Sequence, residues 1–361
     1  QVLGLPESMC TRRWYYLIPM KGTPSKLVHR IEENKLDSLP GTKFVYSSWE
    51  EQHELLRKIL SGKRRVAMQY SPMNDIPYVG LVDCGTVELV RSFGPEVLSS
   101  ADLVQMFEAR WSPEGLAAHR AAGKVVHKVI RQAFAAIKRS IEKKHPLTEY
   151  ELQRHMAEWF VVDEIESSDP PIVAVNAHSG DPHYSPREEG SPSIGKGDFV
   201  LLDVWGKQKF SDAVYFDITW TGYVGDSVPD KYREIFDVVR EARDRAVSFI
   251  QKGVRKGRTV YGWEVDDVAR KIISEKGYGP YFLHRTGHSI GREVHGNGAN
   301  MDNFETRDGR RIVPGTGFSI EPGIYLRDFG VRTEVNVHVS ENDAEVTGEL
   351  QQAVVPILAG D

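Results

Sequence analysis

The sequence has no long apolar run. Its 361 residues are 40% hydrophobic and 27% charged, and no stretch approaches the roughly 18–20 apolar residues that a transmembrane helix needs. The first ten residues contain neither a basic segment nor an apolar one, so we expect no signal peptide. These features exclude an obvious membrane partner and favour a globular protein.

Cysteine and excess charge are also scarce. Only Cys10 and Cys84 occur, and they show no spacing of paired metal ligands. We therefore expect no disulfide scaffold, and a reducing compartment, which makes the predicted location cytoplasmic. The net charge of −5 gives no reason to expect nucleic acid as a partner.

Two segments of different character follow one another along the chain. The first alternates expected strands with expected helices, an α/β pattern without a cluster of metal-ligand residues. At Ser112 and Pro113 a long helix is expected to begin, because serine is a favoured N-cap and proline a favoured first helical residue. We place the domains at 1–111 and 112–361. The expected strands of the first domain are 12–20, 42–48, 64–70 and 86–92, and its expected helices are 50–62 and 101–109.

The second segment groups its strands and helices in blocks, which favours an α+β fold with antiparallel strands. Gly253 and Gly277 are expected to end the last two helices, and Thr148 with Glu151 reads as a capping box. The expected helices run from 113 to 144, from 148 onward, from 229 to 252 and from 262 to 276, and the expected strands include 171–177, 198–206 and 214–222.

Four acidic residues lie in β-branched, apolar runs typical of strands. They are Asp203, Asp217, Glu321 and Glu334, and His288 lies between the two pairs. Each pair is separated by the length of a hairpin, so adjacent antiparallel strands would bring its carboxylates together. Buried carboxylates need a counter-charge. Four of them require about two divalent cations, and a two-metal site is the arrangement used for hydrolysis. Carboxylates with one imidazole favour manganese, with cobalt and zinc as alternatives.

Further candidates surround this set. His284 and His295 flank His288 in a glycine-rich segment, and His183 lies in a loop rich in proline, glycine and serine. Arg332, two residues before Glu334, is expected to share its strand face. It is either a binder of a substrate carboxylate or a charge partner of the acidic residues.

Residues 200–221, 283–296, 318–325 and 330–337 resemble the pita-bread metallopeptidases, which include Xaa-Pro aminopeptidases, prolidases, methionine aminopeptidases and the metal-free relative creatinase. The resemblance covers 113–361, and residues 1–111 resemble the creatinase-type N-terminal domain of the Xaa-Pro branch, without its first strand or so. It implies that Asp203, Asp217, His288, Glu321 and Glu334 are the metal ligands. It also implies that His183, His284 and His295 stabilise the substrate or intermediate, and that Arg332 lies near the substrate.

Three departures from the family pattern concern the surroundings of the site. The loop between Asp203 and Asp217 carries about three extra residues and contains Asp212, a less favoured ligand with polar flanks. Trp220 replaces the usual arginine and is expected to alter the wall of the site. Gly296 replaces an acidic residue.

The resemblance implies a metal-dependent exopeptidase that hydrolyses the bond before proline in Xaa-Pro dipeptides or short Xaa-Pro peptides. It also implies a non-catalytic N-terminal domain and a homodimer. Two alternatives remain: a creatinase-like amidinohydrolase, which needs no metal, and a catalytically inactive binding protein of the same fold. The complete ligand set argues against both.

Overall fold

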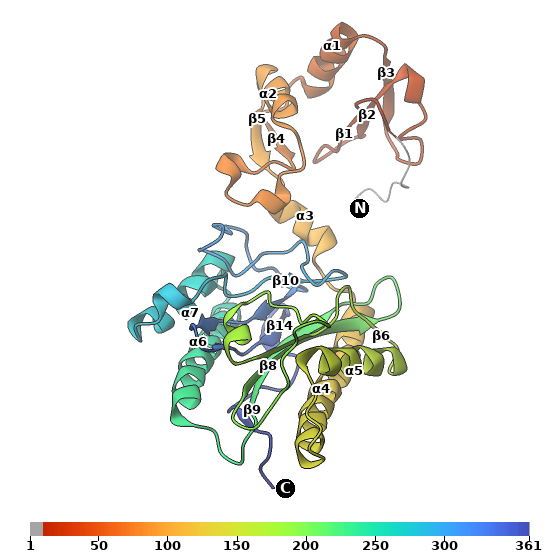
Figure 1. The fold of residues 1–361 in the computed structure, drawn as a ribbon. Coiled ribbons are helices and arrows are strands. Elements are labelled where there is room, and N and C mark those ends of the chain that lie inside the picture. The colour runs from red at the N-terminus through yellow and green to blue at the C-terminus, as the bar shows by residue number, and fades with distance from the viewer. Residues whose placement is uncertain (1–9, 361) are drawn as a thin grey trace. The chain divides into compact units, whose positions relative to one another are not determined.

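The computed structural model describes residues 10–360 and divides the chain into two compact units, with the break between Glu108 and Ala109. The break lies close to the predicted boundary at residue 112. The resemblance of the first unit to a creatinase-type N-terminal domain remains a prediction. In that unit β1 pairs antiparallel with β2, β2 pairs parallel with β3, and β4 pairs parallel with β5 (Figure 1). Its elements are β1 (Tyr15–Leu17), β2 (Ser25–His29), η1 (Arg30–Glu32), β3 (Thr42–Tyr46), α1 (Trp49–Leu60), β4 (Arg65–Met68), η2 (Pro72–Asn74), η3 (Pro77–Val79), α2 (Cys84–Ser92), β5 (Glu96–Ser99) and α3 (Ala101–Glu108).

The expected strand at 86–92 is wrong, because this segment belongs to helix α2. Asp83 caps the helix by accepting hydrogen bonds from the backbone N–H and the hydroxyl of Thr86. Val87 and Val90, one helical turn apart, are both buried in the core of the unit. The N-cap and this spacing override the β-propensity of the two valines.

The second unit carries the site and contains two main sheets, whose strands pair antiparallel except that β16 pairs parallel with β9, and a small antiparallel sheet of β12 and β13. One main sheet has the order β16-β9-β8-β6 with β7 also paired to β8, and the other has the order β10-β11-β14-β15. Its elements are α4 (Pro113–Glu142), α5 (Glu149–Val162), β6 (Ile165–Glu166), β7 (Ile172–Val175), η4 (Asn176–Gly180), β8 (Phe199–Gln208), β9 (Phe216–Tyr223), α6 (Asp230–Arg255), α7 (Gly262–Glu275), η5 (Gly279–Tyr281), β10 (Ser289–Ile290), β11 (Gly317–Ile320), β12 (Gly323–Tyr325), β13 (Gly330–Arg332), β14 (Val335–Val339), β15 (Ala344–Val346) and β16 (Val355–Pro356).

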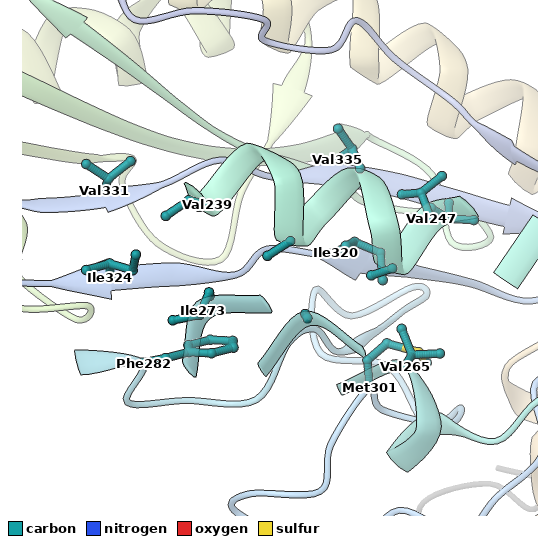
Figure 2. Close-up of a cluster of buried hydrophobic side chains, with 14 of the residues drawn as sticks. Val239, Val247, Val265, Ile273, Phe282, Met301, Ile320, Ile324, Val331 and Val335 are labelled. Carbon is teal, nitrogen blue, oxygen red and sulfur yellow. The ribbon is translucent and has the colours of Figure 1, made fainter. Parts of the chain in front are cut away.

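Each main sheet buries one face beneath a pair of helices. Helices α4 and α5 cover the sheet of β8 and β9, and helices α6 and α7 cover the sheet of β11 and β14 (Figures 1 and 2). Gly123 of α4 allows the closest approach, because a Cβ there would lie 2.6 Å from the ring of Phe216 in β9. The two sheets contact one another through β9 and β14. Side chains on the remaining sheet faces therefore meet in the middle of the unit.

Local sequence explains most helix boundaries of this unit. Ser112 caps α4 and Pro113 is its first residue, and Thr148 and Glu151 form the predicted capping box of α5. Gly277, with φ of 86°, follows the end of α7 as predicted. The predicted end of α6 at Gly253 is wrong: the helix continues to Arg255, and Gly257 adopts the left-handed conformation instead.

Between residues 10 and 360, none of the helices combines the length and apolar character that crossing a membrane requires.

Candidate metal centre

Strands β8 and β9 place the two aspartates on one sheet face. Their antiparallel register pairs Asp203 with Thr219 and Trp205 with Asp217. Paired residues project to the same side of a sheet, as do residues two apart in a strand. Asp203 and Asp217 therefore occupy neighbouring rungs, on the face away from α4.

The two glutamates come from the second sheet. Strands β11 and β14 pair antiparallel with Ile320 opposite Val335, so that Glu321 and Glu334 directly follow and precede a paired position. The predicted pairing of strands within each acidic pair is thus confirmed in both sheets. The Glu334 backbone N–H also donates to the carbonyl of Thr219, at 3.2 Å, which ties the two sheets together at the site.

His288 lies on the segment that leads into β10, and a glycine lets this segment approach β11 closely. A Cβ at Gly287 would lie 2.0 Å from the carbonyl oxygen of Ser319. The His288 N–H donates to the hydroxyl of Ser319 at 2.9 Å, and its Nδ1 lies 3.1 Å from the carbonyl of Ser289. Because a carbonyl only accepts, Nδ1 carries the proton and Nε2 is left for a cation.

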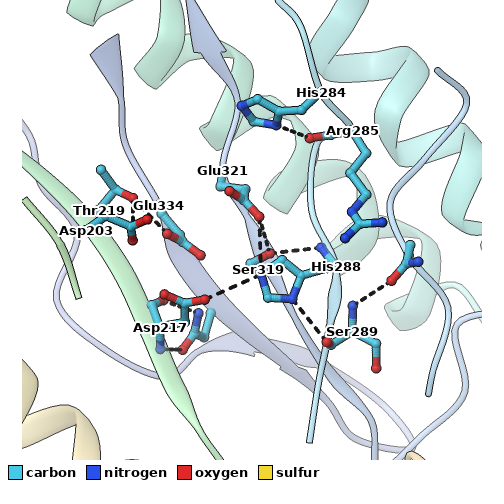
Figure 3. A network of polar contacts seen from close by, with 12 residues as sticks. Asp203, Asp217, Thr219, His284, Arg285, His288, Ser289, Ser319, Glu321 and Glu334 are labelled. Atoms are coloured by element: carbon cyan, nitrogen blue, oxygen red, sulfur yellow. Dashed lines mark hydrogen bonds and ion pairs between the residues drawn. The ribbon is translucent and has the colours of Figure 1, made fainter. Parts of the chain in front are cut away.

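Asp217, His288 and Glu334 converge, with one ligand atom of each within 4.8 Å of the others (Figure 3). His288 Nε2 lies 3.4 Å from Asp217 Oδ2 and 3.4 Å from Glu321 Oε1. Asp203 joins through the hydroxyl of Thr219, which lies 3.1 Å from Asp203 Oδ1 and 2.9 Å from Glu334 Oε2. All five predicted ligands are thus connected in one network.

Electrostatic repulsion makes the network unfavourable without cations. Burial, with repulsion from Asp203, raises the pKa of Asp217 to about 7. Burial and the charges of Asp217 and Glu321 raise the pKa of Glu334 well above its usual value. Burial alone would lower the pKa of His288, but the neighbouring Asp217 and Glu321 raise it. A bound cation would have the opposite effect on these pKa values, because it favours the deprotonated form of each ligand.

The side chains of this network are suited to bind divalent metal ions. Asp217 Oδ1 and Glu334 Oε1 are buried and have no hydrogen-bond partner among the residues that the structure describes. Buried carboxylate oxygens without partners are costly, and a hard dication is the partner that would satisfy them. The donor set of four carboxylates and one imidazole Nε2 suits manganese, cobalt or zinc.

Arg332 is buried at the edge of this network. Its Nη2 donates to Asp203 Oδ2 at 2.6 Å, its Nε donates to the Thr219 hydroxyl at 2.8 Å, and its Nη1 lies 3.0 Å from the hydroxyl of Tyr325. A guanidinium held on three sides positions Asp203. Of the two roles open for Arg332, this geometry favours the charge partner over the substrate-carboxylate binder.

His284 and Arg332 both contact the hydroxyl of Tyr325. The Nδ1 of His284 lies 2.7 Å from the carbonyl of Arg285 and therefore carries the proton, and its Nε2 lies 2.6 Å from the Tyr325 hydroxyl. Burial lowers the pKa of His284 to about 4, so the ring is neutral at pH 7. The Tyr325 hydroxyl thus donates to His284 and accepts from Arg332.

His295 and His183 lie at the rim. The ring of His295 is 4.3 Å from that of His288, whose charge is the largest cause that lowers the pKa of His295 to about 4. The carbonyl of Pro182 lies 3.5 Å from Arg332 Nη1, which brings the exposed His183 to the same region. His183 also lines a cavity of about 480 Å³.

His178, five residues before His183, has a structural partner. Its Nδ1 lies 3.0 Å from the fully buried carboxylate of Glu149, and its ring stacks on that of Tyr184. The Tyr184 hydroxyl donates to the same carboxylate at 2.5 Å. This arrangement orders the loop that presents His183.

The structure places Trp220 and Asp212 outside the site. Trp220 does not form a wall of the site, because its register partner is Leu202 on the helix-covered face, where it packs edge-on against His127 of α4. Asp212 lies outside the network: it is exposed and pairs with Arg292 at 3.4 Å.

Three residues of the site were not predicted. Thr219 and Tyr325 carry hydroxyls that bridge the charged groups, and Trp205 occupies the rung of Asp217. The alternation of β8 and β9 contained the information for Trp205 and Thr219, since each is two residues from a predicted ligand.

Comparisons with known proteins agree with this geometry. Residues 117–341 match the family model of metallopeptidase family M24. The chain belongs to this family, and its fold is the pita-bread fold that the sequence predicted. Coordinates of a prolidase from Thermococcus sibiricus superpose with a TM-score of 0.61 at 23% identity over 97% of this chain and 89% of that one. Those of dipeptidase PepE from Mycobacterium ulcerans give 0.67 at 23% identity over 97% and 88%.

Sequence relatives include the putative dipeptidase YkvY of Bacillus subtilis, 28% identical over 83% of this chain and 76% of that protein. A second relative is the Xaa-Pro dipeptidase of Pyrococcus furiosus, 35% identical over 48% of this chain. That alignment spans 45% of the Pyrococcus protein, less than half of its length.

Proposed function

We propose that the chain is a metal-dependent exopeptidase that hydrolyses the peptide bond before proline in Xaa-Pro dipeptides or short Xaa-Pro peptides. The observation that carries the proposal is the convergence of Asp217, His288 and Glu334, with two buried carboxylate oxygens that lack partners among residues 10–360. Asp203 and Glu321 complete the set. Relatives named Xaa-Pro dipeptidase support the substrate class.

Two divalent ions, with manganese preferred over cobalt and zinc, would be held by the five ligands and would supply an activated water and polarisation of the substrate carbonyl. The residues of the chain do the rest. Glu321 or Glu334 would accept the proton of the attacking water. His295, whose ring lies 4.3 Å from that of His288, would donate one N–H to the carbonyl oxygen as negative charge develops there.

Arg332 and His284 keep the charged groups in place. Arg332 fixes Asp203, and the neutral ring of His284 holds the Tyr325 hydroxyl that also contacts Arg332. His183, on the loop that reaches Arg332, would lie against the proline ring of the substrate. A proline nitrogen in a peptide bond has no hydrogen to donate. A pocket lined by an imidazole ring and apolar side chains therefore suits the proline ring of the substrate.

We also propose a cytoplasmic homodimer whose first unit is non-catalytic. Cys10 and Cys84 are both free thiols, which suits a reducing compartment. Ile18 and Met20 of the first unit are 62% and 100% exposed, a surface that a partner subunit would cover.

The test is hydrolysis of Leu-Pro compared with Leu-Ala by the purified chain supplied with Mn²⁺. The proposal predicts release of proline at a rate well above the release of alanine. Equal rates would remove the proline specificity and leave a general dipeptidase. Failure to hydrolyse either dipeptides or short Xaa-Pro peptides would favour the inactive binding protein, and hydrolysis of creatine would favour the amidinohydrolase.

A further inference from the structure

Trp205 lies beside the predicted metal ligands on the face of β8 that carries them. It is two residues from Asp203 in the same strand, and its register partner in β9 is Asp217. Both relations place its side chain on the face turned away from α4. The indole therefore borders the two aspartates.

An apolar cluster continues from Trp205 toward the histidine segment. Trp205 and Val294 both pack against the buried cluster of Val214, Tyr215 and Ile290, and Val294 directly precedes His295. Although it lies in the middle of a ten-residue strand, Trp205 is only half-buried. Its indole N–H is enclosed and has no acceptor within the part of the chain that the structure describes.

We propose that Trp205 determines specificity, because its indole forms the apolar wall of the pocket for the side chain of the residue before the scissile bond. This inference rests on the proposed function. Among residues 10–360, the hydrogen bonds and ion pairs that hold the five predicted ligands do not involve the side chain of Trp205.

The order of rungs along β8 separates the two substrate residues. The rung of Asp203 and Thr219 is held by Arg332, whose Nη1 lies 3.5 Å from the carbonyl of Pro182, next to His183. The rung of Trp205 and Asp217 comes next, on the side of Val294. With the proline ring against His183, the preceding residue extends toward Trp205.

A flat aromatic wall favours apolar side chains over the absence of a side chain. The pocket should therefore prefer Leu-Pro to Gly-Pro. Contact with a few methylene groups in an apolar pocket changes kcat/KM by about tenfold or more. The Trp205→Ala variant removes the wall and should lower the ratio of kcat/KM for Leu-Pro to that for Gly-Pro by about tenfold.

The experiment measures this ratio in the intact chain and in three variants. Because both substrates meet the same enzyme, the ratio is independent of how much protein is folded or loaded with metal. Trp205→Phe keeps an aromatic face and should retain most of the preference. Trp220→Ala is the matched control, because the same change is made three paired positions away on the opposite face of the sheet, and its ratio should equal that of the intact chain.

An unchanged ratio in Trp205→Ala, or an equal fall in Trp220→Ala, would overturn the inference. So would a variant in which Leu-Pro and Gly-Pro lose equally but the preference for Leu-Pro over Leu-Ala falls, because Trp205 would then contact the proline. Should Trp205→Ala fail to fold, Trp205→Gln keeps much of the volume and gives the same test. Failure of the intact chain to cleave any Xaa-Pro dipeptide or short Xaa-Pro peptide would refute the proposed function instead.

Discussion

Removal of the metal should make the stability of the protein depend on pH, and Asp217 should contribute to this effect. Without a cation, burial and repulsion from Asp203 raise the pKa of Asp217 from 3.8 to about 7. The folded chain therefore keeps a proton on Asp217 at pH values where the unfolded chain has lost it. Protonation of this carboxyl stabilises the metal-free fold.

The sign follows from the proton count of the two states. Between about pH 4 and pH 7 the folded state binds more protons than the unfolded state, so the free energy of unfolding falls as the pH rises. Each pKa unit corresponds to about 1.4 kcal/mol, and a shift of roughly three units gives about 4 kcal/mol. Above about pH 7 the contribution of Asp217 is lost.

Denaturant unfolding of the chelated protein at about pH 5 and about pH 8 measures this effect. Adding Mn²⁺ should restore stability at the higher pH, because a cation that binds only the folded state stabilises it. The Asp217→Asn variant cannot titrate at this position, so its pH dependence should be smaller. A chelated wild-type protein that is equally stable at both pH values, or more stable at the higher one, would refute the reasoning.

Three further predictions concern single residues and assembly. Arg332→Lys should lower kcat/KM about 10–100-fold on both Leu-Pro and Leu-Pro-Gly, because Asp203 loses its forked partner; a loss confined to the dipeptide would instead make Arg332 a binder of the substrate carboxylate. His295→Ala should lower kcat by about 10²–10³ as measured at saturating Leu-Pro, and a change in KM alone would contradict its role as an oxyanion donor. Light scattering at micromolar concentration should give the mass of a dimer, and a monomer would contradict the proposed assembly.

Local rules predicted the helix starts and the strand pairing. Ser112 with Pro113 and the capping box of Thr148 act through contacts within one turn, so the sequence alone contains them. The hairpin-length spacing of the acidic residues was sufficient to predict which strands pair. The segment 86–92 was assigned wrongly because β-propensity was weighed without the N-cap at Asp83.

Side chains alternate between the two faces of a strand. This alternation explains why Trp220 was wrongly expected at the wall of the site and why Trp205 was not predicted there. Trp220 is three residues from Asp217 and must face the opposite side of a regular strand, whereas Trp205 is two residues from Asp203 and must face the same side. Contacts between distant segments were beyond sequence reasoning. Two such contacts are the hydrogen bond between Tyr325 and His284 and the contact of His178 with Glu149. Both depend on how the sheets and loops pack.

The measurement that tests the central claim most directly is proline release from Leu-Pro by the chelated chain as Mn²⁺ is added back. The five-ligand site predicts no release without metal, and a rate that rises to a plateau at up to two ions per chain. Full activity of the chelated chain would show that hydrolysis does not depend on Asp203, Asp217, His288, Glu321 and Glu334 acting as metal ligands, and would contradict the account.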